Sequence, residues 1–305
     1  MVIANIKSGL DQVWANQRMV MIFYVTNLLS GLVLMLPFRA AATKFAGNTL
    51  MGGDLAGRLP MDFVFELFHN NKSLFPVYGV LFVAVAALYG LLSLFMSGGA
   101  FVIFASGERY SGAAFWAGAG KYFGRFARLF LWSVPVFGAL FCLQFAASGI
   151  QRLLFGADPY ETVIYWGAWV RFGLRIAGFL LYMIVLDYAR IHAVTTGEAR
   201  MRIALWHGVK FTLANIGSVL GVAGAIYLAG ILVLVVYNPL ADALAAPNAV
   251  VVMLLFVLQQ LYMVFRMTLR LVLYSSQLNL HNKLAGAPGT YIIPAEPDGL
   301  EGAAA

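Results

Sequence analysis

Six long apolar stretches dominate the pattern of hydrophobic and polar positions along the chain. They cover about residues 19–38, 75–105, 129–148, 165–188, 216–237 and 249–272. A helix needs roughly 20 apolar residues to cross the hydrocarbon core of a bilayer. The stretches are continuous, whereas the strands of a membrane barrel alternate between apolar and polar residues. The pattern therefore predicts an all-α integral membrane protein with six transmembrane helices.

The composition favours the same class of protein. Of the 305 residues, 62% are hydrophobic and only 11% are charged, whereas about a quarter of the residues of a soluble domain are charged. The net charge of +7 indicates attraction to the anionic lipids of an inner leaflet rather than to nucleic acid. The single cysteine, Cys142, lies in the third stretch, where we expect a small buried hydrophobic residue.

The first stretch has an alternative interpretation as a signal peptide, cleaved at the small residues Ala40, Ala41 and Ala42. Its apolar region is longer than the usual 7–15 residues, and Arg39 stands at the would-be cleavage site. We therefore expect an uncleaved helix.

The distribution of basic residues predicts the orientation of the chain. With six spans and a cytoplasmic N-terminus, 13 of the 20 Lys and Arg residues fall on the cytoplasmic side. These are Lys7, Arg18, Arg109, Lys121, Arg125, Arg128, Arg190, Arg200, Arg202, Lys210, Arg266, Arg270 and Lys283. Because basic residues concentrate on the cytoplasmic side of membrane proteins, both termini are predicted to be cytoplasmic.

The segment GAGKYFGRFAR (residues 118–128) has the glycines and lysine of a nucleotide-binding loop. A Walker loop has the pattern G-x-x-x-x-G-K-[ST], and this chain has Phe115 and Tyr122 at two of its anchors. We therefore expect no nucleotide. On a helix, Lys121, Arg125 and Arg128 instead form one basic stripe, which is typical of an amphipathic helix in the membrane interface. The stripe is a candidate for binding anionic lipid headgroups.

The opposite side of this segment is aromatic. It consists of Phe115, Trp116, Tyr122, Phe123 and Phe126. We expect these rings in the headgroup boundary of the membrane. Gly118, Gly120 and Gly124 lower the helix propensity but allow close approach to neighbouring helices.

Self-comparison of the sequence indicates internal repeats. SGERYSGAAFWAG (106–118) aligns without gaps with TGEARMRIALWHG (196–208), and Leu-Tyr-Met begins both LYMIVLDYAR (181–190) and LYMVFRMTLR (261–270). With IKSGLDQVWANQ (6–17) as a third copy, the pattern predicts three parallel units, each an interfacial amphipathic helix followed by a transmembrane helix pair. The units cover about residues 1–105, 109–194 and 199–274, within a single membrane domain of residues 1–284.

Two known groups of membrane proteins invite comparison with these units. Mitochondrial carriers also have three units, but their P-x-[DE]-x-x-[KR] signature is absent, since PMDFVF (60–65) has a phenylalanine at the basic position. The segments AAFWAGAGKYFGRF (113–126) and IALWHGVKFTL (203–213) lead into odd-numbered spans. In this the chain loosely resembles a broad group of bacterial six-transmembrane inner-membrane proteins, including the membrane regions attached to some glycerophosphodiester phosphodiesterases. The resemblance implies a fold and a bacterial inner membrane but no activity, because these residues hold no phosphodiesterase catalytic domain.

Four arginines near the ends of spans are candidates for binding a lipid or another anion. Arg171 and Arg175 share one face of the fourth stretch, and Arg266 and Arg270 share one face of the sixth. Two guanidinium groups on one face can hold a phosphate bidentately. The alternative is that these side chains snorkel to the nearest headgroups.

Other polar residues lie inside the spans. Asp187 and Arg190 form a helical ion pair in one interpretation; in the other, Asp187 pairs with an arginine of the sixth stretch or carries protons. Gln259 and Gln260 lie near the bilayer middle, where we expect hydrogen bonds between helices, with a substrate contact as the alternative.

Two segments lie outside the spans. MDFVFELFHNN (61–71) is predicted to form a short outer helix. Residues 285–305 form a Pro/Gly/Ala-rich tail that has too little apolar mass to fold alone. We expect a cytoplasmic tail that is ordered only when a partner protein holds it.

The candidate functions follow from what these patterns contain. The four histidines lack partners at ligand spacing, so we expect no metal, and no motif indicates a cofactor. We therefore predict a non-enzymatic subunit or scaffold that packs against partner proteins and lipids in a bacterial inner membrane. The main alternative is a transporter of a lipid or small amphiphile with a site between the repeats. An enzyme that acts on lipid head groups is the third hypothesis.

Overall fold

The computed structural model describes residues 2–47, 61–70, 72, 74–156, 158–243 and 249–286, and within these ranges it is helical without β-strands. The helices are α1 (Val2–Ala15), α2 (Gln17–Ala46), α3 (Met61–Asn70), α4 (Leu74–Ser106), α5 (Gly112–Trp132), α6 (Val134–Phe155), α7 (Glu161–Thr196), α8 (Met201–Ala214), α9 (Ile216–Ala243) and α10 (Ala249–Ala285). Nearly all of the tail predicted for 285–305 lies outside the described residues.

Six helical segments among the described residues are long and apolar enough to cross a membrane. They are Gln17–Ala46, Leu74–Ser106, Gly112–Phe155, Glu161–Thr196, Ile216–Ala241 and Val250–Ala285. Each coincides with one predicted stretch, so the prediction of an all-α protein with six spans is confirmed. The helix predicted for residues 61–71 is confirmed as α3, whose Phe63 and Leu67 are buried.

Three of the spans follow a shorter helix after a break of a single residue. Asn16 separates α1 from α2, Ser133 separates α5 from α6, and Asn215 separates α8 from α9. The backbone N–H of Ser133 and that of Asn215 still bond four residues back, to Leu129 and Phe211. Each break therefore changes the direction of the chain without a loop.

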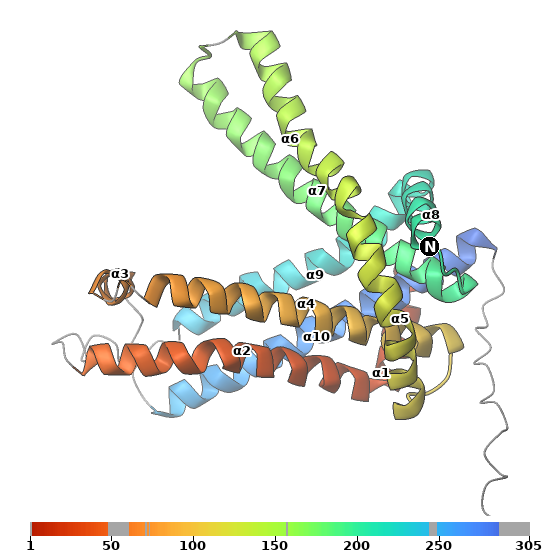
Figure 1. The fold of residues 1–305 in the computed structure, drawn as a ribbon, viewed down its shortest axis with the longest axis horizontal. Coiled ribbons are helices and arrows are strands. Elements are labelled where there is room, and N and C mark those ends of the chain that lie inside the picture. Colours follow the sequence, from red (N-terminus) through yellow and green to blue (C-terminus); the bar gives the residue numbers. More distant parts are fainter. Residues whose placement is uncertain are drawn as a thin grey trace, which may run out of the picture.

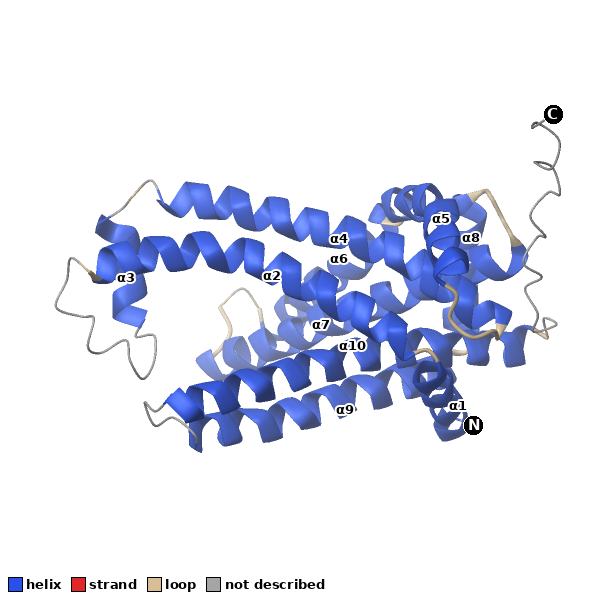
Figure 2. Cartoon of the chain, turned by 90° about the horizontal axis from the view of Figure 1, so that it is seen from below, coloured by secondary structure: helices blue, strands red, loops and turns tan. Residues whose placement is uncertain are grey.

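The spans are arranged as three pairs that diverge from one end of the molecule. α2 packs on α4, α6 on α7, and α9 on α10. Figure 1 shows the α6–α7 hairpin leaving the other two pairs at a wide angle. In Figure 2, the α2–α4 and α9–α10 pairs extend to the same side, with α1, α5 and α8 gathered at the opposite end.

The short helices α1, α5 and α8 form a collar around the end where the pairs meet. α5 packs along α4, α8 along α7, and α1 along α10. The core of the protein lies here, because the most deeply buried large side chains include Phe101, Phe115, Tyr122, Tyr188 and Leu129. The collar is therefore the best-packed part of the described chain, and the outer parts of the pairs carry exposed apolar side chains.

A glycine on each collar helix permits this packing. A Cβ on Gly118 of α5 would lie 2.9 Å from the Val102 side chain, and one on Gly208 of α8 would lie 2.8 Å from the Val185 carbonyl oxygen. A Cβ on Gly9 of α1 would collide with the Ser276 hydroxyl on α10. Each helix therefore approaches its neighbour closely at a position where larger residues do not fit.

Candidate functional site

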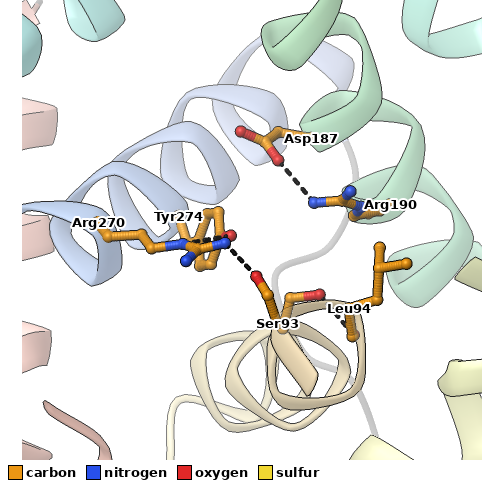
Figure 3. Close-up of polar contacts among 7 residues, drawn as sticks. Ser93, Leu94, Asp187, Arg190, Arg270 and Tyr274 are labelled. Carbon is orange, nitrogen blue, oxygen red and sulfur yellow. Dashed lines mark hydrogen bonds and ion pairs between the residues drawn. The ribbon is translucent and has the colours of Figure 1, made fainter. Parts of the chain in front are cut away.

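The long helices α4, α7 and α10 contact one another at the collar end, and their polar side chains meet there. Figure 3 shows Ser93 from α4, Asp187 and Arg190 from α7, and Arg270 and Tyr274 from α10 facing a common centre. We call these five residues, together with Tyr89 of α4, the charged junction. Each contributing helix belongs to a different pair, so the junction depends on how all three pairs come together.

Arg270 binds only neutral groups among the described residues. Its Nε donates to the Tyr274 hydroxyl at 3.1 Å and its Nη1 to the Tyr89 hydroxyl at 3.4 Å. Its Nη2 donates to the Ser93 hydroxyl (Figure 3). The guanidinium also lies 5.9 Å from the centre of the Phe23 ring, a cation–π contact. Because every acceptor is a hydroxyl, these bonds leave the charge of Arg270 without a directly bonded anion.

Asp187 and Arg190 form a buried ion pair. Arg190 Nη1 donates to Asp187 Oδ1 at 3.1 Å, and the two side chains are only 9–10% exposed. Asp187 also interacts electrostatically with Arg270, and the Gln277 amide lies beside its carboxylate. The predicted pair within α7 is confirmed, and the arginine of the last span that lies near Asp187 is Arg270.

The junction holds one more positive charge than negative. It contains two guanidinium groups and one carboxylate, and no second carboxylate of the described residues pairs with either arginine. Arg190 Nε is buried without a hydrogen-bond partner. An unbalanced buried charge costs several kcal/mol, so the arrangement suits an additional anion.

The junction lies just beyond the base of the α6–α7 hairpin, whose length suits a bilayer. The hydroxyls of Ser133 and Tyr182 share a buried hydrogen bond of 2.7 Å at the base of the α6–α7 hairpin. The 22 residues of α6 extend about 33 Å at 1.5 Å per residue, which matches a hydrocarbon core of about 30 Å. Asp187 lies five residues beyond Tyr182, about 7.5 Å along α7. The junction therefore lies about 7.5 Å beyond the hairpin base, at the collar end of the spans.

Arg171 and Arg175 lie within the α6–α7 hairpin and bind glutamines of α6. Arg175 donates to Oε1 of Gln144 from Nε at 3.0 Å and from Nη2 at 2.7 Å. Arg171 Nη1 donates to Oε1 of Gln151 at 2.6 Å. No carboxylate of the described residues pairs with either arginine. The structure thus adds hydrogen bonds within the hairpin to the two roles considered from the sequence, phosphate binding and snorkelling.

The polar residues of α10 that are neighbours in sequence lie in different surroundings. Arg266 is exposed and lies 5.9 Å from the Tyr262 ring centre, whereas Arg270 belongs to the junction. Gln260 Oε1 accepts a 2.8 Å hydrogen bond from the Tyr24 hydroxyl of α2, and Gln259 is exposed. The expected interhelical bond is therefore formed by Gln260.

The basic stripe of α5 is on the outside of the collar. Lys121 and Arg128 are exposed, and Arg128 Nε bonds the Gly124 carbonyl of its own helix. Arg125 Nη1 donates to the Gly197 carbonyl at 3.1 Å, which connects α5 to the end of α7. Arg125 and Arg128 thus bond within the protein and keep other N–H donors for anionic headgroups.

The prediction that the aromatic side of α5 lies in the headgroup boundary is wrong for three of its five rings, which are buried in the protein. Phe115, Tyr122 and Phe126 are fully buried, and Phe126 contacts Phe101 of α4 with ring centres 6.4 Å apart. An aromatic helix face fits a protein neighbour as well as it fits lipid headgroups, and α4 is that neighbour. Phe123 is half-buried, and Trp116 is exposed at 49%.

Two of the glycines proposed to bring α5 close to a neighbour do not do so. Gly118 is in close contact with α4, but nothing lies within 4 Å of a Cβ built on Gly120 or Gly124.

The expectation that Cys142 is buried was wrong, because this cysteine is exposed on α6. The α6–α7 hairpin diverges from the other pairs, so the side of α6 that carries Cys142 has no protein neighbour in the described chain.

Sequence reasoning missed a group of three histidines. The His192 ring of α7 stacks on His207 of α8 with centres 4.3 Å apart, and His281 of α10 lies 6.3 Å from His192. They come from three segments with no common spacing, so only tertiary structure brings them together. Among the described residues, no group of His, Cys, Asp and Glu has an arrangement that could hold a metal ion.

These features define the class of protein: a helical, multi-pass membrane protein with a charged junction at the base of three diverging helix pairs. Comparisons with protein-family models, curated proteins and solved structures find no match for this chain.

Proposed function

We propose that the protein is a non-enzymatic membrane subunit or scaffold whose α6–α7 hairpin binds a transmembrane helix of a partner protein. The observation that carries the proposal is the position of Arg171 and Arg175. Both lie at membrane depth, in a hairpin whose main contacts outside itself are at the collar end (Figure 1).

Charged side chains inside a bilayer normally face the interior of a helix bundle and pair there. Arg171 lies 11 residues, or about 16 Å along the helix, from the hairpin base at Tyr182. This is about half the length of the hairpin, so Arg171 lies deeper than its place near the end of the apolar stretch predicted. Its hydrogen bond to Gln151 supplies polar contact but no countercharge. A second protein that covers the hairpin can supply the negative charge that the chain lacks at this depth.

The expected partner carries a carboxylate within a transmembrane helix. The acidic residues of the spanning helices lie near helix ends: Glu161 and Asp187 in α7, and Asp242 in the last turn of α9. A second copy of this chain therefore offers no carboxylate at the depth of Arg171 and Arg175. The two arginines are one helical turn apart, so an acidic residue facing this turn can approach both.

We also propose that the fold consists of three repeated units. In support, α1, α5 and α8 each pack on the last helix of another unit through Gly9, Gly118 and Gly208. The residues that these glycines approach include Val102, Ala189 and Ser276, which follow one another at intervals of 87 residues. This contact pattern supports an offset of 87 between the second spans, rather than the 80 of the Leu-Tyr-Met match.

The proposed location is a bacterial inner membrane, with both termini and the collar on the cytoplasmic side. The excess of basic residues supports this side for the collar. Trp14, Trp116 and Trp206 are exposed on α1, α5 and α8, as expected of helices that lie in a membrane interface. Anionic lipids of the inner leaflet are the proposed lipid partners of the collar.

The test uses a photo-crosslinking amino acid at the exposed position Phe172 of the hairpin, followed by mild-detergent purification and mass spectrometry. We expect a crosslink to one transmembrane segment of another protein, which contains Asp or Glu. The double variant Arg171→Gln/Arg175→Gln should lose this crosslink. The control Arg39→Gln/Arg109→Gln removes two exposed charges outside the hairpin and should retain it.

Two outcomes contradict the proposal. One is a crosslink to a second copy of this chain or to a segment without a carboxylate. The other is a protein without a partner whose retained anionic lipid falls in the Arg171→Gln/Arg175→Gln variant, because the hairpin then binds lipid.

The charged junction favours a second candidate function, a transporter of a lipid or small amphiphile. The junction lies between three helix pairs, as expected of a site between repeats. Reconstituted vesicles that contain the protein should then move an anionic amphiphile between leaflets faster than empty vesicles. Equal rates would exclude this candidate.

A further inference from the structure

We propose that the charged junction is a binding site for a phosphate-type anion, held between Arg270 of α10 and Arg190 of α7. The inference concerns a different part of the molecule from the partner-binding hairpin and does not depend on it. It rests on charge, on the direction of the hydrogen bonds, on a buried unpaired donor and on position at the collar end of the spans.

The first support is the unbalanced charge. Two guanidinium groups surround a single carboxylate, Asp187. The only direct ion pair is the one between Asp187 and Arg190, among the residues that the structure describes. Arg270 therefore has hydroxyl groups as its direct hydrogen-bond partners and shares the charge of Asp187 with Arg190. A monoanion bound here brings the three charges to neutrality.

The second support is the direction of the hydrogen bonds around Arg270. The hydroxyl oxygens of Tyr89, Ser93 and Tyr274 accept bonds from its guanidinium. Each hydroxyl therefore keeps its own O–H available as a donor. The guanidinium has five N–H groups, of which these contacts use three. The junction is thus rich in donors, which is the pattern that a phosphate with several acceptor oxygens requires.

The third support is a buried donor without a partner. Arg190 is 9% exposed, and its Nε has no hydrogen-bond partner. Such groups are rare in folded proteins, because each loses its bond to water and gains nothing in return. In Figure 3 the Arg190 guanidinium faces the space around which Asp187, Arg270 and Ser93 are arranged.

The position of the junction allows two sources of this anion. The junction lies beyond the hairpin base at Ser133 and Tyr182, at the collar end of the spans, so a lipid phosphate can reach it from the membrane. A water-soluble phosphate can reach it from the collar side. Both sources share the same chemistry, and the experiment separates them.

The experiment measures binding to delipidated full-length protein in a neutral detergent. Inorganic phosphate, dihexanoyl phosphatidic acid and dihexanoyl phosphatidylcholine are titrated separately, and binding is followed by calorimetry. We expect wild-type protein to bind phosphatidic acid more tightly than phosphatidylcholine. Equal affinity for inorganic phosphate indicates a soluble ligand, and binding of phosphatidic acid alone indicates a lipid headgroup.

Variants of neighbouring arginines locate the site. Arg270→Gln should lower the affinity about tenfold or more, because it removes a charge-assisted contact. Arg266→Gln removes the same charge one turn earlier on α10, from an exposed position, and should leave affinity within about twofold. If Arg270→Gln does not fold, Tyr274→Phe tests the same site, since it removes one donor and keeps the charge.

The proposal is overturned if wild-type protein binds neither anion, or if Arg266→Gln weakens binding as much as Arg270→Gln. Neither result bears on the α6–α7 hairpin, because the titration contains no partner protein.

Discussion

The guanidinium of Arg175 donates two hydrogen bonds, of 3.0 and 2.7 Å, to a single amide oxygen, Oε1 of Gln144 on the neighbouring helix. One turn nearer the tip of the hairpin, Arg171 donates a single hydrogen bond of 2.6 Å to Oε1 of Gln151. Close approach near the base assists this pairing, since a Cβ on Gly178 would lie 3.0 Å from the Leu140 carbonyl oxygen. The hairpin is therefore stabilised by polar contacts along most of its length.

A double-mutant cycle should detect the coupling between Arg175 and Gln144. We expect Gln144→Leu and Arg175→Leu to be coupled by roughly 0.5–1.5 kcal/mol in the free energy of unfolding, the range of hydrogen bonds between membrane helices. Denaturant titration in mixed micelles gives the four free energies. As a control, Cys142→Ala on the exposed side of α6 should show no coupling to Arg175→Leu; a similar coupling there would contradict the assigned contact.

The collar glycines should tolerate no side chain. Gly208→Ala places a methyl group about 2.8 Å from the Val185 carbonyl oxygen and should destabilise the protein by about 1–3 kcal/mol, the usual cost of overpacking. Thermal unfolding in detergent measures the change. Gly120→Ala on α5, where no atom lies within 4 Å, should instead stabilise by about 0.5–1 kcal/mol through helix propensity. Equal effects of the two substitutions would argue against the packing of α8 on α7.

Removing one partner of the buried ion pair should destabilise the protein, and removing both should destabilise it by less than the sum of the two single losses. Asp187→Asn leaves Arg190 and Arg270 without an anionic neighbour, and we expect a loss of about 3–5 kcal/mol. The double variant Asp187→Asn/Arg190→Gln should lose less than the sum of the two single variants, as measured by thermal unfolding. Asp11→Asn, at an exposed position of α1, should change stability by less than about 0.5 kcal/mol. Additive losses at residues 187 and 190 would show that the pair is not coupled.

Two adjacent glutamines should respond differently to the same substitution. Gln260→Leu removes the acceptor of the Tyr24 hydroxyl and should destabilise the contact of α2 with α10 by about 1 kcal/mol. Gln259→Leu replaces an exposed polar side chain with an apolar one and should be neutral or stabilising in a bilayer. The comparison is made by unfolding both variants under identical conditions. A larger effect of Gln259→Leu would reassign the interhelical bond.

Cysteine labelling tests the orientation of the chain. In a Cys142→Ser background, Arg109→Cys lies between α4 and α5 and Lys72→Cys lies before α4, both exposed. With the collar in the cytoplasm, a membrane-impermeant maleimide should label Lys72→Cys on intact cells and Arg109→Cys only after permeabilisation. The reverse pattern would place the collar outside the cell.

The number and extent of the spans could be predicted from the sequence, because run length reports whether a helix can enter a bilayer. The partners of each helix could not. The aromatic face of α5 has the composition of an interfacial surface, yet Phe115 and Tyr122 pack in the protein. Hydropathy measures transfer from water and does not distinguish a lipid neighbour from a protein neighbour.

In the candidate site too, individual residues could be predicted from the sequence but their partners could not. Arg270, Asp187 and Arg190 could be selected from the sequence, since ionisable groups in spans are costly. Tyr89 and Ser93, the hydrogen-bond partners of Arg270 on α4, could not be selected, because hydroxyl residues are tolerated at many positions in membrane helices. The group of His192, His207 and His281 also depends on contacts between segments far apart in sequence.

The packing of α1 on α10 constrains the order of folding during synthesis of the chain. Gly9 meets Val272 and Ser276, and Asn5 accepts a 2.5 Å hydrogen bond from Lys283. At 5–20 residues per second, the ribosome reaches Ser276 roughly 15–50 s after Gly9. During that interval the first helix has been synthesised and its binding surface has not. Helix α1 therefore cannot pack in its final position until the sixth span has been inserted. A chain truncated before α10 leaves α1 without this contact.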